Sequence, residues 1–327
     1  MYLPRMAQSA VPHLLLVNLG TPEAATPESV REFLDEFLSD PAVVDLPRVI
    51  WLPILKWMVL RTRPSRVALQ YAAIWSAEGS PLRVATEFMV RALRMQADDQ
   101  FTVSSAYRYG EPSLTSAMQR LSREGTGPIL VVPLFPQRTD ATVGTTFREA
   151  RRAAKRAGVA QRLVEKMIKP DDPGYIEAMA ACFQSAVSRA TTPPEHLVVS
   201  YHGIPVRYNR RERRMYTDDC RKTTRALLEA IDWPEDSVTH AYQSKFGPEK
   251  WLTPATADVL AELPKQGVSC VAVITPGFVT DGLETLEEIG IRGRETFREA
   301  GGDMLIRVAG VEDHPSFLRS LVALVQG

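Results

Sequence analysis

Short apolar runs alternate with longer amphipathic stretches along most of the chain. The apolar runs are rich in Val, Ile and Leu and have the length of buried strands, whereas the stretches between them have helical spacing. Strands of this kind separated by helices are typical of a parallel sheet covered on both faces. The pattern predicts strands near Leu14–Asn18, Thr102–Tyr107, Ile129–Leu134, Leu163–Ile168, Leu197–Tyr201, Ser237–Tyr242, Val268–Ile274 and Met304–Val308.

The last four of these runs repeat the first four. HLLLVNLGTP, from His13, matches HLVVSYHGIP, from His196, and TVSSAYRYGEP matches SVTHAYQSKFGPE. PILVVPLFPQRTD matches SCVAVITPGFVTD, in the same order. The repeat predicts an α/β fold of two Rossmann-like domains, each with a four-stranded parallel sheet flanked by helices, produced by internal duplication. We expect these domains at residues 1–170 and 171–308, followed by a C-terminal segment, 309–327, whose helix could pack back on the first domain.

An insertion, roughly residues 36–81, lengthens the first half between its first two strands. It holds the longest apolar stretch, VIWLPILKWMVL at Val49–Leu60, which is too short to span a bilayer and lacks clean helical amphipathicity. An insertion that follows the carboxyl end of a strand lies at the edge where such sheets bind ligands. We therefore expect a lip that contacts a ligand or a membrane, with a buried helix as the alternative.

Several function classes lose their usual support. The chain contains no GxGxxG after the first strand, and no GxxxxGK[ST], GxSxG or HExxH. Its 39 basic and 39 acidic residues give zero net charge, so no nucleic-acid partner is expected. The 3 cysteines stand far apart, which argues against a disulfide framework and against an iron–sulfur cluster. With no apolar signal region in residues 1–10, a cytoplasmic protein is expected.

His202 is the first candidate for chemistry. It ends the first strand of the second half, and Gly203 and Pro205 after it favour a sharp turn that presents the ring at the carboxyl edge of the sheet. His13 and His196 stand at the starts of their strands and belong to the opposite edge.

A line of acidic residues is the second candidate. Asp281, Glu284 and Glu288 follow the third strand of the second half at i, i+3 and i+7, which predicts three carboxylates on one helical face. Asp281 and Glu284 could instead be ordinary first-turn acids of a helix. A histidine and a glutamate at neighbouring strand ends suit a borderline divalent metal and can also accept protons.

Six ordered blocks resemble ferrochelatases. They are VNLGTPE, YxxIWxxEGSPL (Tyr71–Leu82), PLFPQ with ATVG (Pro133–Gly144), SYHGIPVRY, YQSKFGPEKWLTPAT (from Tyr242) and PGFVTDGLETLEEI (from Pro276). The resemblance implies two Rossmann-like domains around a porphyrin cleft. It also implies that ferrous iron enters protoporphyrin IX as a substrate with release of two protons, without a nucleotide, redox cofactor or iron–sulfur cluster.

The resemblance also implies roles for particular residues. His202 and Glu284 would be catalytic and touch the metal, and Asp281 and Glu288 would lie on a proton or metal path. The substrate-binding residues would be Leu19, Tyr109, Trp251, Trp51, Leu52 and Ile54. The lip at Val49–Leu60 would receive the apolar substrate, with peripheral membrane contact as a further expectation. The branch that uses coproporphyrin carries Tyr where this chain has Leu19, which favours protoporphyrin IX.

Some departures and alternatives bear on these expectations. Animal relatives often carry a histidine where this chain has Gly282, and Arg292 stands where the acidic line often continues. Whether His202 ligates metal or accepts protons stays open, as does the role of Arg210–Arg214, for which a solvated loop is favoured. A chelatase for another metal or tetrapyrrole and a non-catalytic porphyrin or haem carrier are the alternative functions.

Overall fold

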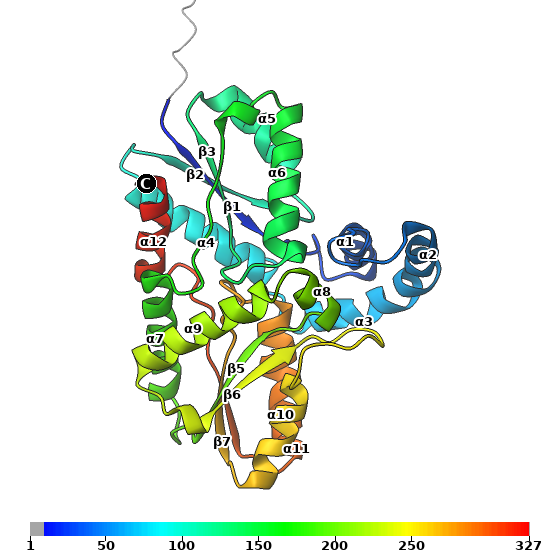
Figure 1. Cartoon of the computed structure of the whole chain (residues 1–327), viewed down its shortest axis with the longest axis vertical. Coiled ribbons are helices and arrows are strands. Elements are labelled where there is room, and N and C mark those ends of the chain that lie inside the picture. The colour runs from blue at the N-terminus through cyan, green and yellow to red at the C-terminus, as the bar shows by residue number, and fades with distance from the viewer. Residues whose placement is uncertain (1–9, 327) are drawn as a thin grey trace, which may run out of the picture.

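Two parallel four-stranded sheets, one above the other in Figure 1, form the centre of the protein. The computed structural model describes residues 10–326. The strand orders are β2-β1-β3-β4 and β6-β5-β7-β8, and both sheets are parallel throughout, as the apolar runs predicted. The strands are β1 His13–Asn18, β2 Thr102–Tyr107, β3 Ile129–Pro133, β4 Leu163–Glu165, β5 His196–His202, β6 Val238–Gln243, β7 Cys270–Ile274 and β8 Met304–Arg307.

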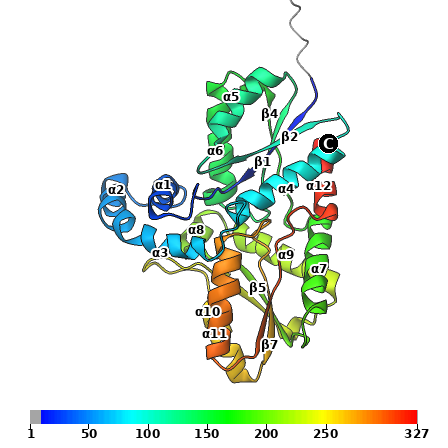
Figure 2. The ribbon, with the colours of Figure 1, turned by 180° about the vertical axis from the view of Figure 1, so that it is seen from behind.

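Helices cover both faces of each sheet (Figures 1 and 2). The α-helices are α1 Pro27–Leu38, α2 Arg48–Ile54, α3 Leu60–Ala72, α4 Pro81–Gln96, α5 Leu114–Glu124, α6 Thr145–Arg156, α7 Pro173–Ser188, α8 Val206–Arg211, α9 Met215–Ile231, α10 Thr256–Glu262, α11 Arg294–Glu299 and α12 Pro315–Gln326. Three segments have π-helical hydrogen bonding: η1 Leu55–Val59, η2 Asp140–Gly144 and η6 Leu283–Gly293. Short 3₁₀ turns are η3 Ala160–Arg162, η4 Glu235–Ser237 and η5 Leu263–Gln266.

The predicted duplication is visible in the geometry of both halves. Each half runs through four strands in the same spatial order, and a π-helix follows the third strand in each. The turn after the second strand is also repeated, because Tyr107 N donates to Pro112 O at 2.8 Å and Tyr242 N donates to Pro254 O at 2.9 Å. His13 and His196 both begin their strands, at the edge opposite His202, as expected.

The two sheets share one hydrophobic core. A single buried cluster includes Leu14 and Leu16 of β1, Leu197 and Val199 of β5, and Phe317 of α12. Helix α12 packs on α7 and reaches α4 of the first half, beside which it lies in both ribbon views. The expected domain boundary at residue 170 falls between β4 and α7, inside this continuous core.

Polar contacts join the carboxyl ends of the two sheets. Asn18 Nδ2 donates to Thr280 Oγ1 at 2.9 Å, and Gln137 Nε2 donates to Thr223 Oγ1 at 2.9 Å. Arg138 forms an ion pair with Asp219 at 3.0 Å, and the Asp219 side chain is almost fully buried. Buried polar pairs of this kind hold the two edges in one geometry because breaking one leaves an unsatisfied group.

The insertion forms a helical arm that projects from the side of the molecule as α2, η1 and α3 (Figure 1). Trp51, Leu55 and Val59 face inward along this arm, whereas Val49, Trp57 and Met58 are exposed. The π-helical segment η1 changes the phase of the helix partway along, which is why the sequence shows no regular amphipathic period. Within residues 10–326, no helix is long and apolar enough to cross a membrane.

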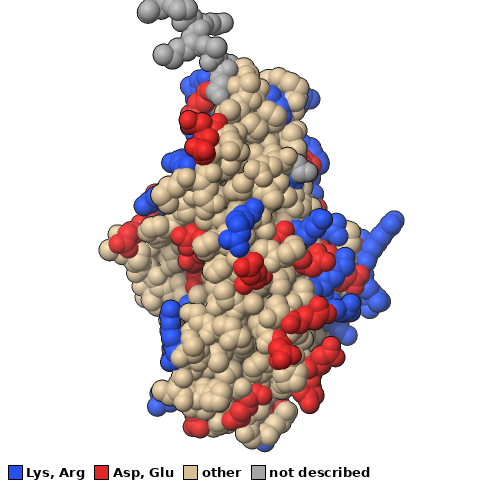
Figure 3. Space-filling model, turned by 90° about the vertical axis from the view of Figure 1, so that its left-hand side faces the viewer, with Lys and Arg blue, Asp and Glu red and all other residues tan. Residues whose placement is uncertain are grey.

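The charged residues do not form one dominant field. On the face shown in Figure 3, acidic and basic side chains lie side by side along one margin, and much of the rest is uncharged. This distribution agrees with the zero net charge of the sequence.

Candidate active site

His202 lies at the carboxyl end of β5, where the following turn fixes its ring. The ring Nδ1 lies 2.7 Å from the carbonyl oxygen of Gly203, which can only accept a hydrogen bond. The proton therefore sits on Nδ1, and Nε2 keeps a free lone pair. Tyr216 donates from its hydroxyl to the backbone oxygen of His202 at 2.6 Å, and the Phe278 ring lies 6.2 Å from the imidazole. The histidine thus presents a base or a metal ligand in one orientation.

Gly203 has no room for a side chain. A Cβ at this position would lie 2.8 Å from the backbone oxygen of Gln243 and 3.1 Å from Cε3 of Trp251. The glycine thus allows the His202 turn to approach both β6 and the Trp251 ring closely.

Glu284 lies in the first turn of η6, a π-helix of 11 residues. π-helices are rare and usually occur as single turns at functional sites, so a segment of this length is unusual. Burial raises the pKa of the Glu284 carboxyl, and the Glu288 and Glu287 carboxylates act in the same direction, whereas His202 opposes them. His202 therefore lies close enough to Glu284 to influence the pKa of its carboxyl.

The expected line of three carboxylates on one helical face is wrong. Asp281 precedes the helix, and its carboxylate is held by Arg307 of β8 at 2.9 Å. A spacing of i, i+3 and i+7 places residues on one face only in an α-helix that includes Asp281. Here η6 begins at Leu283 and has π geometry. Asp281 instead ties the loop after β7 to β8.

The remaining acids of the helix have separate partners. Glu288 lies one turn beyond Glu284 and accepts two hydrogen bonds from Ser244, at 2.8 Å and 2.5 Å. Glu287 is buried, accepts from Gln70 at 3.1 Å and pairs with Arg292 at 2.9 Å. Arg292, which ends the acidic line in the sequence, therefore neutralises a buried carboxylate.

A small apolar cavity of about 100 Å³ adjoins Glu284. Leu19, Leu283, Tyr71 and Glu284 are among its walls. Further apolar side chains come from α1, from α3 and from the turn after α3: Phe33, Leu34, Phe37, Val67 and Ile74. Pockets for organic ligands usually hold about 300–1,000 Å³. The cavity is therefore smaller than the expected porphyrin requires.

The structure separates the other predicted substrate residues. Leu19 lines the cavity. Tyr109 is fully buried behind Phe37, with ring centroids 5.0 Å apart, and its hydroxyl donates to Asp40 at 3.0 Å. Trp251 lies against the Gly203 turn, and its buried Nε1 meets no acceptor in the described part of the chain.

The expectation that Trp51 belongs to a substrate-contacting lip does not fit its position. Trp51 is 5% exposed and donates from Nε1 to the Leu38 carbonyl at 2.7 Å, so it anchors α2 to the end of α1. Leu52 and Ile54 are half-buried and pack on the hydrophobic cluster of the insertion, to which Trp51 also belongs. Neither is among the walls of the cavity. These three side chains belong to α2, whereas Trp57 of η1 is exposed.

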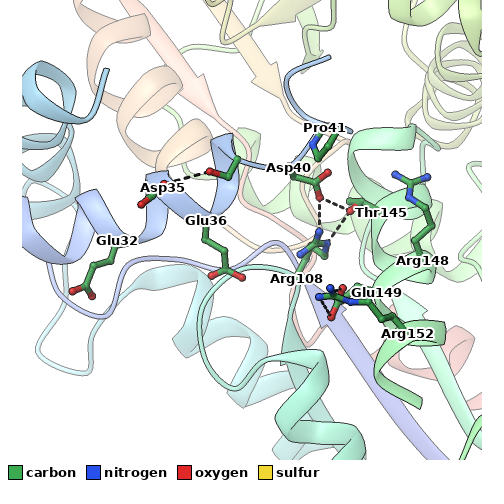
Figure 4. A pocket seen from close by; sticks show the side chains of 11 residues that line it. Glu32, Asp35, Glu36, Asp40, Pro41, Arg108, Thr145, Arg148, Glu149 and Arg152 are labelled. Atoms are coloured by element: carbon green, nitrogen blue, oxygen red, sulfur yellow. Dashed lines mark hydrogen bonds and ion pairs between the residues drawn. The ribbon is translucent and has the colours of Figure 1, made fainter. Parts of the chain in front are cut away.

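A larger polar cavity of about 700 Å³ lies on the other face of α1 (Figure 4). Its centre is the ion pair between Arg108 and Asp40, and Thr145 hydrogen-bonds to both, at 2.9 Å and 2.6 Å. Figure 4 shows Arg148, Glu149 and Arg152 projecting from α6 toward the same space. No pattern in the sequence indicates this cavity, because its walls come from three separate segments.

Two further residues at the site stand at the carboxyl end of β6: Gln243 is its last residue and Ser244 follows it. Gln243 donates to the backbone oxygen of Glu284, and Ser244 holds Glu288. A position just past the end of a parallel strand is the signal that could have identified them.

Comparisons with known proteins agree with this geometry. The Ferrochelatase family profile matches residues 13–327. A ferrochelatase from Methylibium petroleiphilum is 40% identical over 311 residues, which is 94% of this chain and 85% of the relative. A ferrochelatase from Bordetella pertussis is 41% identical, and the match covers 96% of this chain and 87% of the relative. One from Neisseria meningitidis serogroup C is 39% identical, and the match covers 96% of this chain and 92% of the relative.

Solved structures support the fold. SirB from Bacillus subtilis with Fe3+ superposes with a TM-score of 0.57 at 14% identity, covering 97% of this chain and 94% of SirB. The sirohydrochlorin chelatase SirB from Bacillus subtilis subspecies spizizenii in complex with cobalt gives 0.51 at 13% identity with the same coverage. The fold is thus that of two-domain chelatases. Because the family profile spans residues 13–327 and the relatives are about 40% identical over most of their length, this chain belongs to the ferrochelatase family.

Proposed function

We propose that this ferrochelatase inserts ferrous iron into protoporphyrin IX between His202 and Glu284, with no additional cofactor. That the chain is a ferrochelatase, and hence a lyase, follows from the family profile and from relatives of about 40% identity. The observation that carries the assignment of the site is the pairing of His202, whose Nε2 is free, with Glu284, whose pKa is raised, beside an apolar cavity.

The reaction requires that two pyrrole N–H groups lose their protons while iron binds the four ring nitrogens. Glu284 with a raised pKa is a stronger base than an ordinary glutamate, which suits it to accept a pyrrole proton near neutral pH. His202 Nε2 can take the other proton or bind the incoming iron. The hydrogen bond to Gly203 keeps the ring in the required tautomer in either case.

The surroundings favour a macrocycle at this site. Apolar side chains of α1 and α3 supply burial for the ring, and binding energy from these contacts can be used to distort it so that the nitrogen lone pairs are exposed. The Trp251 N–H, which has no acceptor among residues 10–326, is available to a polar group of the substrate.

Leu19 supports the choice of porphyrin. It lines the cavity beside Phe33, Leu34 and Leu283, and its side chain, unlike that of a tyrosine, offers no hydroxyl to an additional propionate. Coproporphyrin III carries four propionates and would bury two more charged groups, which is costly without partners.

Anaerobic incubation of the purified protein with protoporphyrin IX and ferrous iron tests the function. We expect the haem spectrum to appear, and coproporphyrin III to give a kcat/KM at least about tenfold lower, since one unpaired buried charge costs more than 1.4 kcal/mol. Absence of haem would refute the activity. Equal or faster turnover of coproporphyrin III would refute only the role of Leu19.

The helical arm supports a second contact, with a membrane surface. Val49, Ile50, Trp57 and Met58 are all more than half exposed, and Arg61 lies over the Trp57 ring at 4.4 Å. Apolar and aromatic side chains beside basic ones suit the interface of anionic lipids. We expect the protein to sediment with vesicles that contain anionic lipid, and the double variant Trp57→Ser with Met58→Ser to remain in the supernatant with unchanged thermal stability. Equal sedimentation of both proteins would refute the contact.

A further inference from the structure

Gln243 hydrogen-bonds both to the turn after His202 and to the backbone of Glu284. In the parallel pairing of β5 and β6 it stands opposite His202, and its backbone oxygen accepts from Gly203 N at 2.8 Å. Its side-chain Nε2 donates to the backbone oxygen of Glu284 at 2.8 Å. The amide is almost fully buried, and Ser200 donates to its Oε1 at 2.8 Å, so both ends of the amide are occupied and its orientation is determined.

Ser244 extends the same connection by one turn of the π-helix. Its backbone N–H and its hydroxyl donate to the two carboxylate oxygens of Glu288. Ser244 adopts a φ of +64°, a conformation that costs energy for a residue with a side chain and is found where the surroundings require it. This backbone geometry allows N–H and Oγ to point at one carboxylate together.

We propose that Gln243 and Ser244 are positioning residues that set the register of η6 against β5, and thereby the separation of Glu284 from His202 Nε2. This inference rests on the proposed function, because it assigns a cause to the catalytic geometry. A π-helix has fewer supporting sequence preferences than an α-helix and depends on outside contacts to hold its form. Gln243 fixes its first turn and Ser244 its second, both from the strand next to His202.

The other contacts of η6 act elsewhere. Gln70 of α3 donates to Glu287, and Arg292 pairs with Glu287 from within the helix itself. The first interaction joins η6 to the insertion, and the second stays within η6. Neither connects η6 to β5 or β6. Gln70 therefore provides a matched control: a glutamine amide that donates to the same helix without joining it to His202.

The test compares Gln243→Met with Gln70→Met. Each loses one amide hydrogen bond to η6 and keeps a side chain of similar length. For Gln243→Met we expect kcat for iron insertion to fall about 10- to 100-fold, because a misplacement of the order of 1 Å can cost that much, with the KM and Kd for protoporphyrin IX within about twofold of wild type. For Gln70→Met we expect kcat to stay within about twofold.

Thermal unfolding of both variants separates positioning from stability. Each is expected to lower the Tm by a few degrees, as the loss of about 1 kcal/mol would. If Gln243→Met keeps wild-type kcat, or if Gln70→Met loses as much as Gln243→Met, the positioning role is wrong. If the wild-type protein makes no haem, the proposed function fails first, and that result is recognised before any variant is measured.

Ser244 gives an independent check that does not depend on Gln243. Ser244→Ala loses the hydroxyl and keeps the strained φ, whereas Ser244→Gly loses the hydroxyl and relieves the strain. If Ser244 acts by holding Glu288, both variants lower kcat by a similar factor, and adding Glu288→Ala to either causes little further loss. Additive losses would contradict a shared action and overturn the assignment of Ser244.

Discussion

The two halves of this ferrochelatase have the same scaffold and use it differently. The first-half position that corresponds to His202 is Leu19. Asp140 corresponds to Asp281, so Val143, three residues after Asp140, corresponds to Glu284. Both halves keep the turn glycine, Gly20 or Gly203. One strand end therefore carries the candidate catalytic histidine, and its counterpart carries an apolar side chain in the wall of the cavity beside Glu284.

The residues after the second strand differ in a parallel way. Arg108 and Tyr109 correspond to Gln243 and Ser244, given the register of the strands with β1 and β5. In the first half these side chains bind Asp40, at the end of α1, and so hold the insertion. In the second half they bind the π-helix. The same structural position therefore holds the insertion in one half and the π-helix in the other.

Converting the second half toward the first should have the largest effect. His202→Leu places at the end of β5 the residue found at the end of β1, and we expect at least a 10³-fold loss of iron insertion, since both a base and a metal ligand disappear. Porphyrin binding, followed by fluorescence, should persist. The control is His196→Gln at the opposite end of β5, which should leave turnover near wild type. Turnover by His202→Leu within tenfold of wild type would show that the comparison has located the wrong strand end.

Glu284→Gln keeps size and hydrogen-bonding capacity but removes the base. We expect kcat to fall about 10²–10⁴-fold, as is usual for loss of a general base, with unchanged porphyrin affinity. Glu288→Gln should cost less, because the amide oxygen still accepts from Ser244 and Glu288 lies one turn further on. Steady-state kinetics of the two variants show which glutamate is the base. An inactive Glu288→Gln together with an active Glu284→Gln would assign that role to Glu288 instead.

The paired glycines should respond differently to alanine. At Gly203 an added Cβ meets Gln243 and Trp251, so we expect kcat to fall about 10–100-fold with a modest loss of stability. At Gly20 the φ is +112° and a Cβ would lie 1.8 Å from the Tyr109 oxygen, so the expected result is a loss of about 3 kcal/mol or more in the free energy of unfolding. Urea titration and kinetics of both variants measure the contrast. The opposite ranking would mean that the first turn is the catalytic one.

The strand-start histidines should show the smallest difference, in acid stability. Burial lowers the pKa of His13 to about 3, and the nearby Arg120 lowers it further. Burial also lowers the pKa of His196, but that ring is only half-buried. A depressed histidine pKa means that the unfolded chain binds more protons between about pH 6.5 and 3. Stability from a neutral His13 is therefore complete above pH 6.5 and decreases as the pH falls, by up to about 1.4 kcal/mol per unit.

Replacing His13 tests this dependence. His13→Asn should flatten the stability curve between pH 6.5 and 4, measured by urea unfolding, relative to His196→Asn. An unchanged slope in His13→Asn would contradict the effect of burial.

Much of this protein could be predicted from local pattern. Apolar runs of strand length located all eight strands of the two sheets, because a strand buried on both faces must be apolar throughout its length. The repeat of HLLLVNLG and HLVVSYHG revealed the duplication, and the strand-end turn after His202 marked the site, since both follow from residues adjacent in sequence. Glu284 could be assigned by resemblance to the family.

The rest was decided by tertiary contacts. Trp51 is buried because it packs on α1 and donates to the Leu38 carbonyl, a contact between segments that periodicity does not show. Periodicity also assumes an α-helix, and η6, which begins at Leu283 with π geometry, leaves Asp281 outside the acidic face. Asp281 then paired with Arg307, which lies on a strand that spacing alone could not bring near it. Gln243 and Ser244 lie in one of the blocks that resemble ferrochelatases, but their contacts with η6 exist only because the fold brings the end of β6 next to that helix. Local sequence determines which segments are strands and helices, whereas the partners of a buried polar group depend on which segments the fold brings together.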